Sequence, residues 1–151
     1  MLDEAFGADR FGRTAYKIRQ GTQPVDALSF GMDDEGHLVG TIQCWPVEVA
    51  PENGAAAALV MVGPVAVIPE RQGQYIGHAL MNAMIATADR SGAPPQMLIG
   101  DPEYYGRWDF TADRTGGWDA PGPFERHRLL LRDSQHRLLP AHGMLGPRKG
   151  G

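Results

Sequence analysis

One segment near the middle of the chain constrains the fold most, because it reads as a strand, a glycine-containing loop and a helix in direct succession. Residues 59–67 form an apolar run, and a loop with glycines at Gly73 and Gly77 follows it. Apolar residues then recur at helical spacing over residues 77–90, and Gly92 ends the pattern. The first turn of a helix has free N–H groups at the positive end of the helix dipole, so this loop is predicted to cradle an anion such as pyrophosphate.

The segments on either side of this unit supply the rest of the predicted sheet. A second apolar strand at residues 96–100 follows the central helix, and this order predicts a right-handed crossover between two parallel strands. Asp101 and Pro102 suit the N-cap and the first position of another helix. The other predicted elements are a helix at 10–19, a strand at 28–32, a turn at 33–36, a strand at 37–49, a turn at 51–54 and a last strand at 126–132.

These elements predict an α+β fold with a mixed, mostly antiparallel sheet. An antiparallel meander comes first, and one parallel βαβ unit lies in the middle. With 151 residues, the chain is long enough for one domain with a substantial core. We place this domain at residues 1–145. Residues 146–151, Gly-Pro-Arg-Lys-Gly-Gly, are predicted to form a disordered tail.

Composition argues against several classes of function. The formal net charge of −4 and the isoelectric point near 5.7 argue against a nucleic-acid-binding surface. No apolar run approaches ~18 residues and no basic segment precedes an apolar one at the start, so we expect neither a membrane span nor a secretory signal. Cys44 is the only cysteine and the histidines lack metal-ligand spacing, so we expect a cytoplasmic protein without a disulfide or a bound metal.

Pro64 interrupts an apolar strand that otherwise has the character of a central strand. Proline removes a backbone donor from the ladder, so it marks an edge or a bulge. A bulge beside a parallel neighbour would part the two strands and leave backbone groups free to pair with an extended ligand. The alternative is a bulge with a structural role only. On the preceding predicted strand, Cys44 is expected to be a buried apolar residue, and Trp45 is expected in the core or lining a pocket.

Two short segments resemble the GNAT N-acetyltransferase superfamily. Residues 72–77, Gln-Gly-Gln-Tyr-Ile-Gly, are similar to the Gln/Arg-x-x-Gly-x-Gly/Ala loop that binds acyl-CoA pyrophosphate in this superfamily. Residues 104–110, Tyr-Tyr-Gly-Arg-Trp-Asp-Phe, resemble its aromatic-Tyr-x-Lys/Arg-x-Gly-Phe segment, at a matching distance. Residues 63–69 and the Gly-Asp-Pro-x-Tyr-Tyr segment at 100–105 are similar to a bacterial subgroup. The likeness covers roughly residues 2–131 and implies a GNAT-like acyl-CoA N-acyltransferase fold.

The resemblance implies roles for individual residues. The backbones of Val65, Ala66 and Val67 would pair with the pantetheine arm and polarise the thioester carbonyl. Tyr105 would donate a proton to the departing CoA thiolate, a role that suits a phenol. The backbone N–H groups that would hold the pyrophosphate belong to Gln72, Gly73, Gln74, Tyr75, Ile76, Gly77 and His78.

The chain departs from the superfamily pattern at three positions. Tyr75 and Asp109 stand where glycine is usual, and Leu98 stands where an asparagine often occurs late in the second parallel strand. The pattern also leaves the general base open. Glu48, Glu52 and a base acting through water are alternatives.

The hypothesis is therefore an acyl-CoA-dependent N-acyltransferase that moves an acetyl group from acetyl-CoA to a primary amine by direct attack in a ternary complex. The acceptor would be a small-molecule or peptide amine. Acidic residues on the acceptor side would favour a cationic amine; these are Glu48, Glu52, Asp101 and Asp109. Two alternatives are a non-catalytic acyl-CoA-binding sensor or partner-binding module, and a nucleotide-binding α/β protein that uses the same loop.

The start of the chain leads to a prediction about assembly. GNAT domains usually begin with a strand before the first helix, whereas this chain starts within that helix, so the first strand is expected to be missing. An open sheet edge is a template for pairing. We therefore expect a homodimer, formed by edge pairing or by exchange of C-terminal segments, unless the true start lies upstream.

Overall fold

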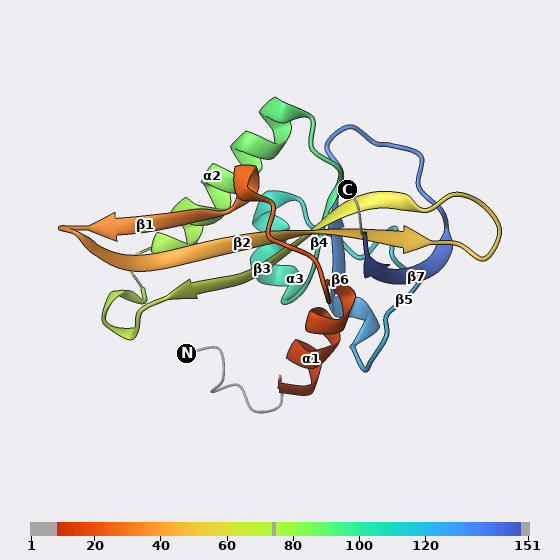
Figure 1. Cartoon of the computed structure of the whole chain (residues 1–151), viewed down its shortest axis with the longest axis horizontal. Helices are drawn as coiled ribbons and strands as arrows, with labels where there is room; N and C mark the ends of the chain where they lie inside the picture. Colours follow the sequence, from red (N-terminus) through yellow and green to blue (C-terminus); the bar gives the residue numbers. More distant parts are fainter. Residues whose placement is uncertain (1–8, 74, 149–151) are drawn as a thin grey trace.

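The computed structural model describes residues 9–73 and 75–148, which fold around one mixed β-sheet with a helix on each face (Figure 1). The sheet has the order β5-β7-β2-β3-β4-β6, and β1 also pairs with β2. The strands are β1 (Phe30–Asp34), β2 (His37–Ala50), β3 (Ala57–Val67), β4 (Gln96–Ile99), β5 (Gly117–Asp119), β6 (Leu129–Arg132) and β7 (His142–Pro147). The helices are α1 (Asp9–Ile18), α2 (Ile76–Ser91) and α3 (Pro102–Tyr105). The predicted α+β class is confirmed.

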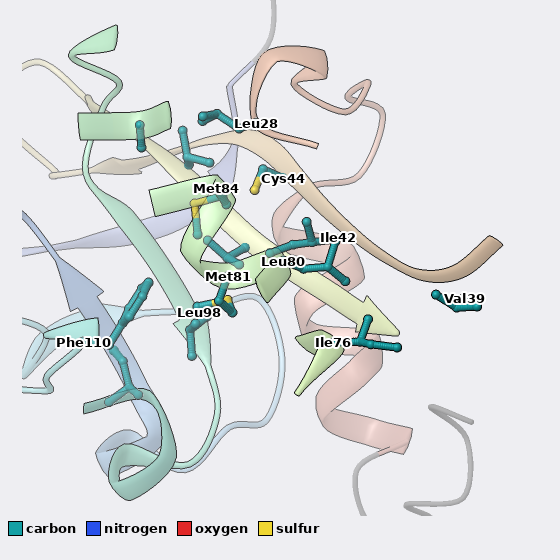
Figure 2. Packing of buried hydrophobic residues seen from close by; sticks show 14 residues of the cluster. Leu28, Val39, Ile42, Cys44, Ile76, Leu80, Met81, Met84, Leu98 and Phe110 are labelled. Atoms are coloured by element: carbon teal, nitrogen blue, oxygen red, sulfur yellow. The ribbon is translucent and has the colours of Figure 1, made fainter. Parts of the chain in front are cut away.

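Side chains of the long strands alternate between two apolar clusters, one on each face of the sheet. The cluster under α2 includes Cys44 from the sheet and Met84 from the helix (Figure 2). Val60 of β3 belongs to the same cluster. The cluster under α1 includes Trp45 from β2 and Ile18 from the helix. Because a strand directs successive side chains to opposite faces, the apolar strand β3 contributes to both clusters.

The central βαβ unit is the one that the sequence predicts. Strand β4 follows α2 and pairs in parallel with β3. Gly92 caps the end of α2 with a φ of 69°, in the left-handed region that favours glycine. The Asp101 side chain accepts a hydrogen bond from the Glu103 N–H at 2.9 Å, and Pro102 occupies the first position of α3. A 3-10 turn, Gly106–Trp108, continues this helix.

The β1–β2 hairpin turns through Glu35 and Gly36, whose φ angles are 52° and 82°. Two left-handed residues match the right-handed twist of the flanking strands, so the hairpin closes tightly at these residues. The predicted strand at 28–32 begins too early. Leu28 ends a 3-10 turn, Asp26–Leu28, and is buried in the cluster under α2.

The C-terminal part contains more strands than the sequence predicts. Strand β7 pairs antiparallel with β2, and β5 pairs in parallel with β7. The predicted tail at 146–151 starts too early, because Gly146 and Pro147 belong to β7 and Arg148 donates hydrogen bonds to two carbonyls of β2 and β3. Residues 149–151 lie outside the described part. The predicted strand at 126–132 is too long, since a 3-10 turn, Arg126–Arg128, precedes β6.

Helix α1 is the first element of the described chain. Residues 1–8 lie outside the described residues, so the expected absence of a first strand stays a prediction. Within residues 9–73 and 75–148, strand β1 has β2 as its one strand neighbour. None of the described helices combines the length and the apolar character needed to span a bilayer.

Cys44 provides a test of the core under α2. The side chain is fully buried, and burial raises the pKa of its thiol from 9.0 to about 12. We expect an aromatic disulfide reagent to label the native protein at least about a thousand-fold more slowly than the unfolded protein, because the thiolate fraction falls ten-fold per pKa unit. Labelling in concentrated guanidinium chloride is the control, and rapid labelling of the native protein at pH 8 would show that the thiol is accessible.

The same shift has a consequence for stability. The Cys44 thiol ionises more readily in the unfolded state than in the folded state. Its contribution to the free energy of unfolding is therefore complete below about pH 9 and is lost as the pH rises toward 12.

Candidate active site

Strands β3 and β4 lie side by side for a short distance and then part. The parallel ladder joins residues 60–61 of β3 to 96–97 of β4. Beyond it, β3 stays paired with β2 as far as Val67, while β4 stays paired with β6 as far as Ile99. The two strands therefore flank a gap in the ladder, which we call the β3–β4 slot. It occurs beside Pro64, where the sequence predicts a parting of the strands.

A bulge at Gly63 and Pro64 produces this parting, because the register between β2 and β3 shifts there. Gly63 has a φ of 128°, which favours glycine. The Trp45 Nε1 donates a hydrogen bond of 2.7 Å to the Gly63 carbonyl. This bond satisfies a carbonyl that the bulge removes from the regular ladder, and so it fixes the bulge in place.

Past the bulge, the backbone of β3 is divided between β2 and the slot. The Ile68 N–H donates to a β2 carbonyl at 3.0 Å, so strand alternation directs the backbone of Ala66 to β2 as well. Val65 and Val67 then direct their backbone groups to the slot, and the Val67 carbonyl accepts a hydrogen bond of 3.1 Å from the Gln72 side chain. Of the three residues assigned to the pantetheine arm, Ala66 is the one whose backbone turns away.

A cavity of ≈ 320 Å³, which we call the loop-side cavity, lies between the end of β3 and the start of α2. Its lining residues are Val67, Arg71, Gln72, Gly73, Tyr75, Ile76, Gly77, His78 and Tyr104. Every described residue of the predicted pyrophosphate loop lines it, and Gln74 lies outside the described residues. Within the described chain, the N–H groups of Ile76 and Gly77 donate to no protein acceptor. The start of α2 thus offers free donors at the positive end of the helix dipole.

Two arginines lie beside this cavity, and of these Arg107 forms no ion pair with a described carboxylate and so adds positive charge. Arg71 forms an ion pair of 2.7 Å with Asp34, which ties the loop to the β1–β2 hairpin. The Arg107 guanidinium lies 4.5 Å from the centre of the Tyr104 ring, and its Nη1 lies 3.2 Å from the Nε2 of His78. Positive charge and free N–H groups together suit a phosphate group.

Tyr105 lies at the end of β4, next to the slot. Its ring covers Gly100, where a Cβ atom would come within 2.6 Å of the ring carbon Cε2. The ring also lies edge-on to Tyr104 and Phe110, at centroid distances of 4.9 and 6.1 Å. Burial raises the pKa of Tyr105 to about 12, with a smaller rise from Tyr104 and an opposing effect of Arg128. The phenol is therefore protonated at neutral pH, as a general acid must be.

Arg128 is a residue of the site that sequence reasoning missed. Its Nε donates to the Gly100 carbonyl at 3.2 Å, and the Gly100 N–H donates to the Arg128 carbonyl at 2.9 Å. Its charge acts on the Tyr105 hydroxyl, whose pKa it lowers. A basic residue within the last predicted strand, 126–132, is the one signal in the sequence. That signal has no chemical meaning until the residues before β6 are placed beside the end of β4.

Comparison with known proteins agrees with this geometry. A family model described as an acetyltransferase (GNAT) domain matches residues 1–112, a stretch that contains the bulge, the loop and Tyr105. The chain belongs to the GNAT acetyltransferase family.

The GNAT relatives are distant in sequence but cover most of the chain. The Escherichia coli K12 protein called uncharacterized N-acetyltransferase YhbS is 26% identical over 137 residues, covering 85% of this chain and 78% of its own. A GNAT family acetyltransferase from Brucella melitensis, solved in complex with acetyl-CoA, is 26% identical with a TM-score of 0.60, covering 80% of this chain and 66% of its own. The crystal structure of YhbS from Escherichia coli in complex with CoA has a TM-score of 0.65 at 20% identity, covers 97% of this chain and 80% of its own, and supports the fold.

The departures from the GNAT pattern have a structural explanation. Tyr75 and Asp109 have φ angles of 61° and 69°, a left-handed conformation that glycine adopts without strain. The glycines usual at these two positions would suit this left-handed conformation. This chain has the same conformation there with larger side chains. Leu98 is 3% exposed and packs in the cluster under α2, so it acts as a core residue.

Neither Glu48 nor Glu52, the two carboxylates considered as general bases, lies near this slot. Glu48 pairs with Ala58 near the start of β3, and Val65 follows roughly 20 Å further along the strand. Glu52 lines a second cavity of ≈ 980 Å³ near the far ends of β2 and β7, and no residue of the slot or the loop lines that cavity. Among the described residues, no group of three or more His, Cys, Asp and Glu side chains is arranged to hold a metal ion.

Proposed function

We propose that this GNAT family member is an N-acetyltransferase that moves an acetyl group from acetyl-CoA to a primary amine by direct attack in a ternary complex. The observation that supports it best is the β3–β4 slot, which is adjacent to the cavity at the start of α2. A slot with unpaired strand backbone suits the amide-containing pantetheine arm. The free N–H groups of Ile76 and Gly77 suit the pyrophosphate.

In this proposal, each part of the chain has a separate task in the reaction. The N–H groups of Val65 and Val67 hold the arm and polarise the thioester carbonyl. As the C–N bond to the acceptor forms and the C–S bond breaks, the Tyr105 hydroxyl gives its proton to the leaving sulfur. The attacking amine loses its proton to water, and Tyr105 regains one from solvent. Holding both substrates in one site supplies much of the rate enhancement.

The placement in a bacterial subgroup of the family is also part of the proposal, and the likeness of the Gly-Asp-Pro-x-Tyr-Tyr segment supports it. Three residues of this segment have a defined structural task. Gly100 leaves room for the Tyr105 ring. Asp101 caps α3, and Pro102 begins it. A cytoplasmic location is also part of the proposal, because a reducing compartment keeps a lone cysteine such as Cys44 in its thiol form.

Two measurements test the proposed function. Calorimetry with CoA, acetyl-CoA, NAD and ATP identifies the ligand, and thiol release from acetyl-CoA over an amine library detects turnover. We expect CoA and acetyl-CoA to bind and several amines to release thiol. Binding of acetyl-CoA without turnover of any amine would make the protein a non-catalytic acyl-CoA-binding module. Binding of ATP or NAD but not CoA would make it a nucleotide-binding protein.

We also propose a homodimer, on the basis of the free edge of β1. Strand β1 pairs with β2 along one edge, and no other described strand covers its second edge. Uncovered edges tend to pair, and a two-fold symmetric dimer would cover two of them at once. Light scattering at about 50 μM should then give twice the chain mass, because ordinary dimers bind tightly enough to form at this concentration. A monomer at that concentration would show that the edge stays unpaired or is covered within the chain.

A further inference from the structure

Trp45 marks the face of the sheet from which an acceptor would approach. Its indole packs in the cluster under α1, on the face opposite α2, and bonds the Gly63 carbonyl at the bulge. The helix α2, whose start lines the loop-side cavity, packs on the other face. Two substrates that meet in one ternary complex need separate approaches to the reacting carbon. The face of the sheet on which Trp45 lies is therefore the one left for the approach of the amine.

Arg19 is the charged residue that lies against Trp45 on this side. It follows the last residue of α1, and its guanidinium carbon lies 3.9 Å from the centre of the Trp45 ring and 5.1 Å from that of Tyr16. The side chain is half-buried, and burial lowers the pKa of Arg19. A cation that has lost part of its water shell in this way gains most from an anionic partner.

No described residue supplies that partner. Within residues 9–73 and 75–148, Arg19 forms no ion pair with a carboxylate and its guanidinium donates no hydrogen bond. The contrast with other arginines is clear, because five of them form ion pairs with aspartates: Arg71, Arg114, Arg126, Arg132 and Arg137. Arg128 and Arg148 donate to backbone carbonyls instead. Arg19 is thus held in place by aromatic rings, and none of the described residues takes up its donors.

We propose that Arg19, stacked on Trp45 beside the bulge, binds a carboxylate on the acceptor, so that the acceptor class is amines bearing a carboxylate. This inference rests on the proposed acetyl transfer. A guanidinium is planar and presents paired N–H donors that match the two oxygens of a carboxylate. One guanidinium balances one negative charge, which suits a carboxylate better than a phosphate dianion.

The proposal reverses the expectation of a cationic acceptor. Glu48 and Glu52 lie at the far end of the sheet, and the Asp101 side chain is occupied in capping α3. A second positive group on the acceptor would meet the Arg19 cation instead and be repelled.

Matched pairs of amines test the proposal in the unmodified protein. Glycine, β-alanine and γ-aminobutyrate, each compared with its carboxamide, vary the spacing between the amine and the carboxylate. With acetyl-CoA saturating, we expect at least one carboxylate to exceed its carboxamide in kcat/KM by at least about ten-fold, through KM, because a hydrogen bond between two charged groups is stronger than one to a neutral amide. Equal kcat/KM values within every pair would overturn the proposal and leave the acetyltransferase function standing.

Two variants separate the charge of Arg19 from its packing. Arg19→Met keeps an unbranched apolar stem over Trp45 and removes the cation, so the preference for the carboxylate should disappear while turnover of the carboxamide remains. Arg19→Lys keeps a charge without the planar fork and should recover part of the preference. Arg90→Met, an equivalent change at the exposed end of α2, is the control and should keep the full preference.

A binding measurement decides the proposal even if no amine is acetylated. The Trp45 indole N–H resonance reports ligands at Arg19, because the guanidinium lies against that ring. In CoA-saturated protein, the carboxylates should shift this resonance saturably and the carboxamides should not, and Arg19→Met should abolish the shift. Absence of any shift with the three carboxylates would overturn the carboxylate site. Saturable shifts without thiol release would instead contradict the proposed catalysis.

Discussion

Replacing Tyr105 by phenylalanine should lower kcat by about 10²- to 10⁴-fold with little change in the KM for acetyl-CoA, because general acid catalysis contributes about that much. The change deletes the hydroxyl and keeps the ring that packs over Gly100. No described residue forms a hydrogen bond with this hydroxyl, so its removal leaves no partner unsatisfied and the melting temperature should change little. Steady-state kinetics with a fast amine measures the effect.

Tyr104→Phe is the matched control. The Tyr104 hydroxyl lies near the start of α2, 3.9 Å from the position that a Cβ atom on Gly77 would take. Tyr104 also lines the loop-side cavity. Its loss should therefore act on the KM for acetyl-CoA and much less on kcat. If Tyr105→Phe turns over at the wild-type rate, Tyr105 is a packing residue and the acid is elsewhere.

The raised pKa of Tyr105 also predicts the shape of the pH profile. Burial disfavours the phenolate, so the protonated form persists up to a pKa of about 12. Ionisation of Tyr105 should then cause no fall in kcat between about pH 7 and 10. A basic limb in that range that disappears in Tyr105→Phe would mean that the phenol ionises far more easily in the working enzyme than in this structure.

The parts of the fold that the sequence predicts are those with strong local signals. The β3–α2–β4 unit has an apolar run, a glycine loop, a helical period and a capping Gly92 in order, and each signal acts within a few residues. The bulge at Pro64 was predictable for the same reason, since proline removes a ladder donor whatever its surroundings.

The strands that the sequence misses have no local signal of their own. Strand β7 contains Gly143, Gly146 and Pro147, which are poor strand formers, and it exists because it pairs with a stretch of β2 far away in the sequence. A Cβ on Gly143 would come within 3.0 Å of the Ala50 backbone, so close packing against β2 explains that glycine. Such a reason is visible only when both strands are in place.

Site residues divide in the same way. The loop residues around Gly77 are predictable because their task depends on backbone at the start of a helix. Arg19 and Arg128 are not, because each acts through a residue distant in sequence, Trp45 and Gly100 respectively. The error over Glu48 has the same origin: being on a neighbouring strand says nothing about which end of that strand faces the slot.

Gly77→Val should weaken acetyl-CoA binding by at least about ten-fold, or about 1.4 kcal/mol, and leave the fold intact. A Cβ on Gly77 would lie 3.9 Å from the Tyr104 hydroxyl and 4.0 Å from a Val65 methyl carbon, so the protein itself accommodates the first added atom. The two further methyl groups would enter the cavity of ≈ 320 Å³ where the pyrophosphate is proposed to lie, beside the free N–H groups of the helix. Calorimetry with acetyl-CoA measures the loss.

Ala83→Val is the matched control, since it places the same β-branched side chain on an exposed position of α2. Both variants carry the small helix-propensity cost of valine, less than about 1 kcal/mol, so their melting temperatures should be similar. Only Gly77→Val should lose affinity, and Gly77→Ala should fall between it and the wild type because one methyl group fills less of the cavity. Equal affinities for all four proteins would remove the pyrophosphate from the start of α2. The ligand would then have to approach the β3–β4 slot by another route.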